Sequence, residues 1–298
     1  MVTPEADPRT LNKAFTVYAL AYVLALLIAA AVGYVLRERH PILIVFIADI
    51  AGTLVIYAFG RVFRNASFYD AYWSVAPLAI ALYWMFGAAP GGAVPTRQII
   101  VITLVFIWGL RLTCNWARQW RGLKHEDWRY QDFRKKSGGW FWLVDLVGIE
   151  LMPTVLVFLG CLSLYPALAT GSNSFGLLDG LAVIVTGSAI AVETIADEQL
   201  RRFTQVKPRA GATMDKGLWA YSRHPNYFGE VMFWWGLFLF ALAADADYWW
   251  TITGPAAITL LFVFVSIPMM EKRSLERRPG YGEHRKKISA LVPWFPKK

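Results

Sequence analysis

Residues 217–230 read GLWAYSRHPNYFGE, and this polar cluster runs directly into the apolar stretch VMFWWGLFLFALA. Pro225 and Gly229 break the cluster. A helix that begins near Asn226 would direct free backbone N–H groups and its positive dipole end at the cluster, an arrangement that suits an anionic ligand. The alternative is a basic juxtamembrane anchor with a helix cap. The cluster lies at the N-terminal end of a hydrophobic helix. Whether that helix lies in a membrane depends on the rest of the chain, and this decides between the two interpretations.

The composition is that of a membrane protein. The 298 residues are 56% hydrophobic and 17% charged, whereas soluble domains average about 25% charged residues. Several apolar runs approach or exceed the ~18–20 residues needed to cross the hydrocarbon layer. They are continuous, whereas a transmembrane barrel has alternating runs of ~10 residues. We therefore predict an all-α polytopic helix bundle, built as a single integral membrane domain over residues 1–298, without a cleavable signal.

About eight apolar segments are candidate transmembrane helices. The segment at 227–244 is short and could form half of a hairpin, so seven spanning helices is the alternative. The segments are 14–36, 41–60, 71–88, 98–117, 141–166, 177–200, 227–244 and 248–270.

The net charge of +9 has a topological explanation. Of the 30 Lys and Arg residues, 24 lie in 61–69, 118–140, 201–226 and the tail from 271. Basic residues therefore follow every second helix, which is the positive-inside pattern and places both termini in the cytoplasm. Membrane topology and the attraction of basic loops to anionic lipid headgroups together explain the positive charge. We therefore predict no nucleic-acid partner.

The cysteines and histidines do not indicate a disulfide framework or a metal site. Cys114 and Cys161 lie inside apolar segments and are expected to be free thiols. The four histidines are scattered, so we predict no metal. Neither GxGxxG after a strand nor GxxxxGK[ST] occurs, which excludes Rossmann and P-loop sites.

Polar side chains extend into the apolar helices at helical spacing. Buried ionisable groups must pair or face a wet cavity. We expect one cytoplasm-facing pocket where these helix ends meet, and separate intramembrane ion pairs are the alternative. Arginines, amides and carboxylates around a helix N-terminus suit a ligand with phosphates, hydroxyls and a base. One face carries Arg111, Asn115, Arg118 and Gln119; another carries Glu193, Asp197 and Arg201; Asp70, Asp145 and Glu150 lie at or within other helices.

Two stretches resemble a known family. GLWAYSRHPNYFGEVMFWWG and EKRSLERRPGYGEHRKKISALVPWFP are similar to the C-terminal half of the steroid 5α-reductase family. Its superfamily also contains sterol C14- and C7-reductases, the lamin B receptor and isoprenylcysteine carboxyl methyltransferase. The resemblance covers about 190–298, with further similarity over 98–120 and 65–80. The RHPNY-x-GE motif is specific for the superfamily and does not by itself separate reductase from methyltransferase.

The resemblance implies an oxidoreductase of the bacterial inner membrane that uses NADPH to reduce a conjugated C=C bond of a 3-oxo steroid or similar enone lipid. Residues 1–90 would form the substrate side and 98–298 the cofactor side. The substrate would enter from the bilayer, and we expect a monomer. The implied cofactor residues are Arg111, Asn115, Arg118, Gln119, Glu193, Asp197, Arg201, Arg223, His224, Asn226, Tyr227, Glu230, Glu271 and Tyr281.

For catalysis, the family has an early carboxylate at a fixed distance before a proline, which polarises the substrate carbonyl. Counting back from Pro77 gives Asp70, flanked by Tyr69 and Tyr72. A family tyrosine that donates to the substrate oxygen aligns with Trp108, whose indole N–H donates a hydrogen bond but relays no proton. The interpretation of Asp70 from the residues alone is a helix N-cap.

Two other functions stay open. An S-adenosylmethionine-dependent methyltransferase of the isoprenylcysteine type shares the HPNY stretch, although such relatives usually carry a Glu pair where Glu271 is here followed by Lys272. The other is a sterol- or lipid-binding protein without turnover. Binding of NADPH or of S-adenosylmethionine, and oxidation of the cofactor by enone lipids, separate the three.

Overall fold

The computed structural model describes residues 8–88, 91–206 and 211–297. These residues form α-helices with short 3₁₀ and π segments and no β-strand; one isolated bridge joins Ser222 and Ser289. The predicted all-α bundle is confirmed. A chain of apolar runs folds this way because lipid offers backbone N–H and C=O groups no partner, so each helix must satisfy its own.

Seven stretches of the described residues are long and apolar enough to cross a membrane, and the chain is an integral membrane protein. The prediction that a count of seven would come from a short helix at 227–244 is wrong. That helix, α9, has 20 residues and qualifies, whereas the helix at 72–86 has only 15. Fifteen residues rise roughly 22 Å, short of the ~30 Å hydrocarbon layer.

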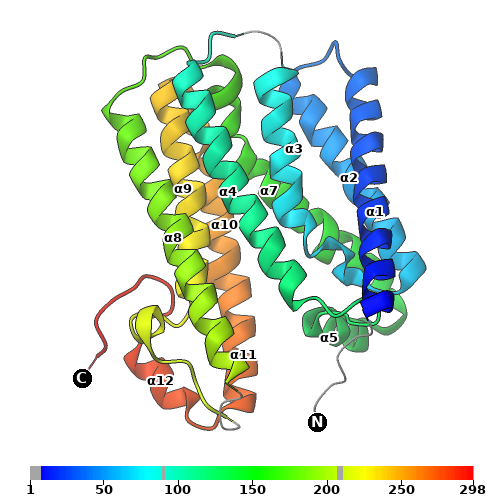
Figure 1. Ribbon diagram of the computed structural model, residues 1–298, viewed down its shortest axis with the longest axis vertical. Helices are drawn as coiled ribbons and strands as arrows, with labels where there is room; N and C mark the ends of the chain where they lie inside the picture. Colours follow the sequence, from blue (N-terminus) through cyan, green and yellow to red (C-terminus); the bar gives the residue numbers. More distant parts are fainter. Residues whose placement is uncertain (1–7, 89–90, 207–210, 298) are drawn as a thin grey trace. The chain divides into compact units, whose positions relative to one another are not determined.

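The chain divides into two compact units, of which the first holds residues 1–90 and 105–165. Figure 1 shows α1, α2 and α3 side by side, coloured from blue to cyan. Pro41 and Pro95 start α2 and α4, where a missing N–H costs nothing. The elements are α1 (Pro8–Val35), α2 (Pro41–Phe63), η1 (Ala66–Tyr69), α3 (Tyr72–Phe86), the later part of α4 (Pro95–Gln119), α5 (Trp128–Ser137), η2 (Gly138–Trp140), α6 (Phe141–Val144), η3 (Asp145–Leu151) and α7 (Met152–Cys161).

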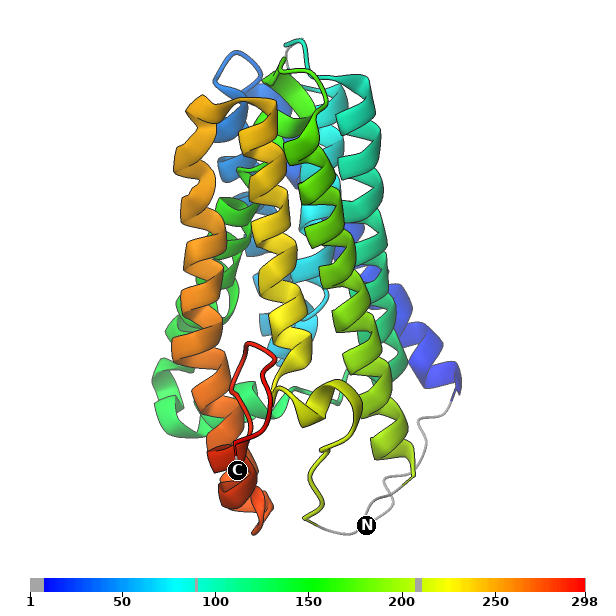
Figure 2. The ribbon, with the colours of Figure 1, turned by 90° about the vertical axis from the view of Figure 1, so that its left-hand side faces the viewer.

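The second unit holds residues 91–104 and 166–298. Figure 2 shows α8, α9 and α10 as neighbouring helices, with the segment after α12 returning toward the start of α9. The elements are η4 (Pro166–Thr170), α8 (Leu177–Gln205), η5 (Gly217–Ala220), α9 (Pro225–Ala244), η6 (Ala246–Ile252), α10 (Thr253–Leu261), η7 (Phe262–Ser266), α11 (Ile267–Arg277) and α12 (Tyr281–Lys287).

Glycines bring α8 and α9 into close contact. A Cβ added at Gly236 would lie 2.1 Å from the Thr186 hydroxyl oxygen, and one at Gly229 would lie 2.7 Å from Glu193 Cβ. Small residues at a helix crossing let backbones approach and gain packing in lipid, where no hydrophobic effect drives association. The α8–α9 pair therefore supports the polar residues that both helices carry.

Arg97 and Asp179 form a buried ion pair in the second unit. Arg97 Nε donates to Asp179 Oδ1 at 2.7 Å, and both side chains are at most 1% exposed. Arg97 Nη2 also donates to Asp179 Oδ2 at 2.9 Å and to the Asn173 carbonyl at 3.0 Å. The backbone N–H of Gly176 donates to the same carboxylate at 2.9 Å, so the pair also caps α8. These bonds join the first turns of α4 and α8.

Candidate functional site

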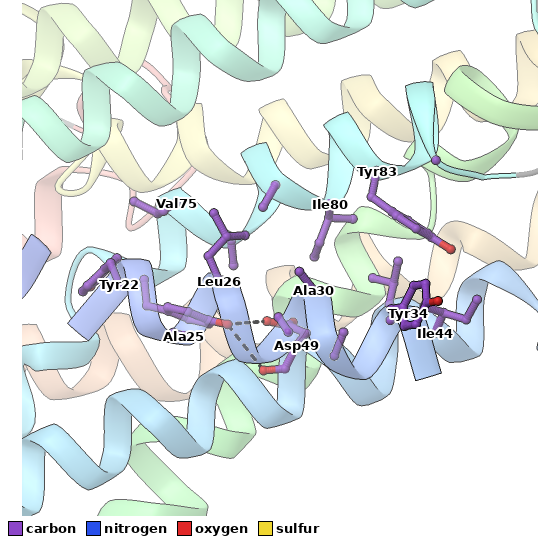
Figure 3. Close-up of a pocket in the computed structure, with 18 of the residues that line it drawn as sticks. Tyr22, Ala25, Leu26, Ala30, Tyr34, Ile44, Asp49, Val75, Ile80 and Tyr83 are labelled. Atoms are coloured by element: carbon purple, nitrogen blue, oxygen red, sulfur yellow. Dashed lines mark hydrogen bonds between the residues drawn. The ribbon is translucent and has the colours of Figure 1, made fainter. Parts of the chain in front are cut away.

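A cavity of about 560 Å³ lies among α1, α2 and α3 of the first unit. Figure 3 shows its walls, with Leu26 and Ala30 on α1, Val75 and Ile80 on α3, and Asp49 on α2. Small residues on α1 leave the space that larger side chains would fill. The lining is Tyr22, Val23, Ala25, Leu26, Ala29, Ala30, Gly33, Tyr34, Arg37, Ile44, Val45, Ala48, Asp49, Tyr72, Val75, Ala76, Ala79, Ile80, Tyr83 and Gly87.

Asp49 and Tyr72, here called the acid pair, are two hydrogen-bonded polar residues in the lining of this cavity. The Tyr72 hydroxyl donates to Asp49 Oδ1 at 2.9 Å. Asp49 Oδ2 is buried and makes no hydrogen bond, although the side chain lines the cavity. A buried polar atom without a partner costs free energy, so this oxygen is suited to bind one polar atom of a ligand.

Gly52 makes room for the acid pair. A Cβ at this position would lie 2.6 Å from the Tyr72 hydroxyl oxygen. A glycine one turn along α2 from Asp49 therefore lets the phenol reach the carboxyl.

Sequence reasoning found Tyr72 and missed Asp49. An ionisable residue inside an apolar helix is a functional candidate by itself, and Asp49 was the only one within the 41–60 segment. That signal was available. The hydrogen bond between Asp49 and Tyr72, 23 positions apart, could not be predicted from the sequence.

Asp70 lies outside the cavity lining, at the C-terminal end of η1. It is partly buried and accepts a hydrogen bond from the Tyr130 hydroxyl at 2.8 Å. Burial raises the pKa of Asp70 to about 6, and the Arg129 guanidinium offsets part of that rise. The N-cap interpretation of Asp70 is wrong, because Ala71 precedes α3 at that position.

We predict that Asp70→Asn changes how stability depends on pH. The pKa of Asp70 in the folded protein, about 6, lies above its ordinary value of 3.8. Its contribution to stability is therefore full below about pH 4 and is lost as the pH rises through about 6. Between these values the wild type should lose about 1–2 kcal/mol relative to Asp70→Asn, allowing for partial exposure. Melting curves of both proteins in one detergent measure this difference, and parallel curves would contradict it.

The other two predicted catalytic residues are buried in the first unit. The Tyr69 hydroxyl shares a hydrogen bond of 2.8 Å with Thr154, and Trp108 on α4 is fully buried. Neither lines the cavity. Their predicted contact with substrate stays a prediction.

The predicted polar face of α4 belongs to the first unit. Its four residues lie on one continuous helix, as expected, and Gln119 Nε2 donates to Asn115 Oδ1 at 3.2 Å. Arg118 and Gln119 are exposed at the end of the helix. The predicted single pocket joins this face to residues of the second unit and stays a prediction.

The second unit places several predicted cofactor residues around the start of α9, which begins at Pro225 as expected. Asn226 Nδ2 donates to Asp197 Oδ1 of α8 at 3.2 Å. The rings of His224 and Tyr227 stack with centroids 5.2 Å apart. Glu230 accepts a hydrogen bond from Trp234 Nε1 at 2.9 Å. Glu193, which sequence reasoning placed on the same face of α8 as Asp197, is buried.

Two arginines converge on Glu271 of α11. Arg223 Nε donates to Glu271 Oε1 at 2.7 Å, and Arg285 Nε lies 3.0 Å from Oε2. Arg223 also donates to the carbonyls of Arg285 and Ile288, so its donors hold the C-terminal segment. A phosphate could reach the Arg223 guanidinium only by displacing these partners.

The remaining predicted residues have clear positions. Arg201 pairs with Glu198 at 2.7 Å, while Tyr281 is buried at the start of α12. Cys114 and Cys161 are free. No group of His, Cys, Asp and Glu in the described part of the chain is arranged to hold a metal ion.

Comparison with known proteins shows that a family profile matches this chain. The profile of a family described as "Protein of unknown function (DUF1295)" matches residues 56–288. The chain is also 27% identical over 278 residues to an uncharacterised protein of Schizosaccharomyces pombe, C594.04c. That alignment covers 82% of this chain and 79% of the yeast protein. No solved structure shows significant similarity.

Proposed function

The chain belongs to the DUF1295 family, and for this member we propose NADPH-dependent reduction of a conjugated C=C bond in an enone lipid, such as a 3-oxo steroid. The acid pair in an otherwise apolar cavity carries this proposal. The resemblance of the RHPNY-x-GE motif to the steroid 5α-reductase family supports it.

The cavity favours a substrate with a large apolar body and one oxygen. Its volume lies within the ~300–1,000 Å³ of small-molecule sites, and nearly all of its lining is aliphatic or aromatic. Among the lining residues, Asp49 alone has a fully buried polar side-chain atom without a hydrogen bond, Oδ2. A lipid ketone matches this distribution because its one carbonyl can meet that atom while the rest of the molecule meets apolar side chains.

The acid pair would stabilise the charge that develops on the carbonyl oxygen. Charging a carboxyl in apolar surroundings is costly, so we take Asp49 as a neutral acid whose Oδ2 donates to the carbonyl. Tyr72 holds Oδ1 and thereby fixes the orientation of the carboxyl. When bound, NADPH would supply the hydride for the β-carbon of the enone. A donor that is already oriented at the enolate oxygen lowers the barrier of this step.

The second unit offers groups that fit the cofactor. His224 Nε2 and Asn226 Oδ1 are buried and make no hydrogen bond. Hydroxyl and carboxamide groups of a dinucleotide can satisfy such atoms. We therefore assign NADPH to the α8–α9 residues, with Asp197 orienting Asn226.

The proposal includes a location. We propose that the protein lies in the inner membrane with its basic loops facing the cytoplasm. Both termini share that side if α3 completes an eighth crossing. The lipid would reach the cavity from the bilayer, through the α1 and α3 walls. No second protein is required for this reaction.

We predict that filling the cavity blocks the reaction. Ala30 lines the cavity, whereas its neighbour Ala31 is exposed and does not. Ala30→Trp should lower kcat/KM for enone lipids about 10- to 100-fold, since overpacking costs about 1–3 kcal/mol. Ala31→Trp is the matched control and should retain activity. Equal activities of the two variants would show that substrate does not occupy this cavity.

Activity in nanodiscs tests the function itself. The purified protein, NADPH and a 3-oxo-Δ4 steroid should give oxidised cofactor and saturated ketone in equal amounts. Calorimetry with S-adenosylmethionine tests the methyltransferase alternative. Binding of steroid without oxidation of NADPH would favour a lipid-binding protein and contradict the proposal.

A further inference from the structure

Three hydroxyls continue inward from the acid pair, and we call them the hydroxyl row: Thr53, Thr154 and Tyr69. Thr53 lies one turn along α2 from Asp49, and its hydroxyl interacts with that of Tyr72. The hydroxyl oxygens of Thr53 and Thr154 are 2.9 Å apart, and that of Tyr69 is 2.8 Å from Thr154. All three side chains are at most 3% exposed. Hydrogen bonds therefore join the three hydroxyls of the row, which begins beside the acid pair and extends into the interior of the first unit.

A buried acid lies at the inner side of the hydroxyl row. Glu150 is 0% exposed, and neither of its carboxyl oxygens makes a hydrogen bond. It lies within the π-helical turn η3, one turn before Thr154. Its backbone carbonyl accepts the hydrogen bond of the Thr154 hydroxyl, so this acid lies beside the row. Such π-helical turns are frequent at functional sites, and a buried acid inside a membrane helix is itself a functional candidate.

Thr154 can connect or interrupt the row. In the structure its hydroxyl donates to the Glu150 carbonyl at 2.8 Å. A rotation about its Cβ–Oγ1 bond would turn the hydrogen toward Thr53, whose oxygen is 2.9 Å away. The hydroxyl would then accept a hydrogen bond from Tyr69 and donate one to Thr53, the arrangement needed to pass a proton.

We propose that the hydroxyl row is a proton path that reloads the acid pair from the Glu150 side. The inference rests on the proposed function for its purpose. Reduction of the enone consumes one hydride from NADPH, which is oxidised, and one proton, so the C=C bond becomes CH–CH. Asp49 supplies that proton and becomes a carboxylate. Tyr72 then gives its hydroxyl proton to Asp49 and takes one from Thr53, which is resupplied in turn through Thr154 and Tyr69. Glu150 supplies the proton that Tyr69 takes up, becomes a carboxylate, and is reprotonated from solvent.

Hydrogen–deuterium exchange at Asp49 tests the path without substrate or cofactor. The infrared band of the protonated Asp49 carboxyl is identified by its loss in Asp49→Asn, and its shift is followed after transfer of nanodiscs to D₂O. Thr154→Val removes the central hydroxyl at nearly constant volume. It should slow the shift about tenfold or more, the effect of losing a link worth at least ~1.4 kcal/mol in the barrier. Thr154→Ser should restore the wild-type rate.

Thr186→Val is the matched control. Thr186 is equally buried and also donates to the carbonyl four residues earlier, at 2.7 Å, but it lies in α8 outside the row. Its exchange should match the wild type. Thr53→Val tests the next link and should also slow exchange.

Three outcomes are decisive. Wild-type exchange in both Thr154→Val and Thr53→Val overturns the path, as does the absence of any protonated Asp49 band. Slowed exchange together with no NADPH oxidation by enone lipids supports the path and refutes the proposed reaction. The two proposals therefore fail separately.

Discussion

Asp49→Asn is expected to lower kcat for enone reduction about 100- to 1,000-fold, within the usual range for the loss of a positioned general acid. The amide fills nearly the same volume, so lipid binding and the KM for NADPH should change little. Like the neutral carboxyl, the amide can donate a hydrogen bond to the carbonyl, but it cannot give up a proton at neutral pH. Steady-state kinetics in nanodiscs, with steroid binding measured in parallel, give both quantities.

Two variants sharpen the interpretation of Asp49→Asn. Tyr72→Phe removes the hydrogen bond that orients the carboxyl and should lower kcat less than Asp49→Asn does. Asp70→Asn leaves the cavity lining intact and should retain most of the activity. If Asp70→Asn abolished turnover and Asp49→Asn did not, the residue that sequence reasoning chose would be the catalytic one and the cavity assignment would be wrong.

Asp179→Ala is expected to destabilise the protein by about 3–5 kcal/mol, because it leaves the Arg97 guanidinium buried without its counter-charge. It also removes the acceptor for the Gly176 N–H at the start of α8. Unfolding in increasing mole fractions of SDS, followed by tryptophan fluorescence, measures the loss. Arg97→Met combined with Asp179→Leu should recover much of the stability, since replacing a buried pair by apolar groups is often neutral.

An exposed ion pair provides the control for Asp179→Ala. Glu283 and Lys286 lie 2.7 Å apart on α12, with both side chains 73% exposed. Solvent screens such a pair, so Glu283→Ala should leave the unfolding curve almost unchanged. A loss at Glu283 equal to that at Asp179 would show that burial of the Arg97 pair is not what makes it important.

The positions of the apolar helices could be predicted from the sequence. Each predicted segment corresponds to a helical stretch, for example 177–200 to α8 and 41–60 to α2. The reason is local: an apolar run in lipid must form hydrogen bonds within itself, so hydropathy and length suffice. The polar face of α4 and the polar face of α8 could likewise be predicted, because the spacing of the polar residues matches the helical repeat.

The tertiary structure alone decided which acid meets the cavity. Asp70 and Asp49 are both carboxylates at or within apolar segments, and the family spacing before Pro77 pointed to Asp70. Packing of α3 against α2 brings the Tyr72 phenol to Asp49 and leaves Asp70 beside Tyr130. Likewise, only the tertiary structure places Arg223, a predicted cofactor residue, against Glu271, 48 positions away. Helix formation depends on neighbours within a few residues, whereas pairing of buried charges depends on residues far apart in the chain, and only the folded molecule brings those together.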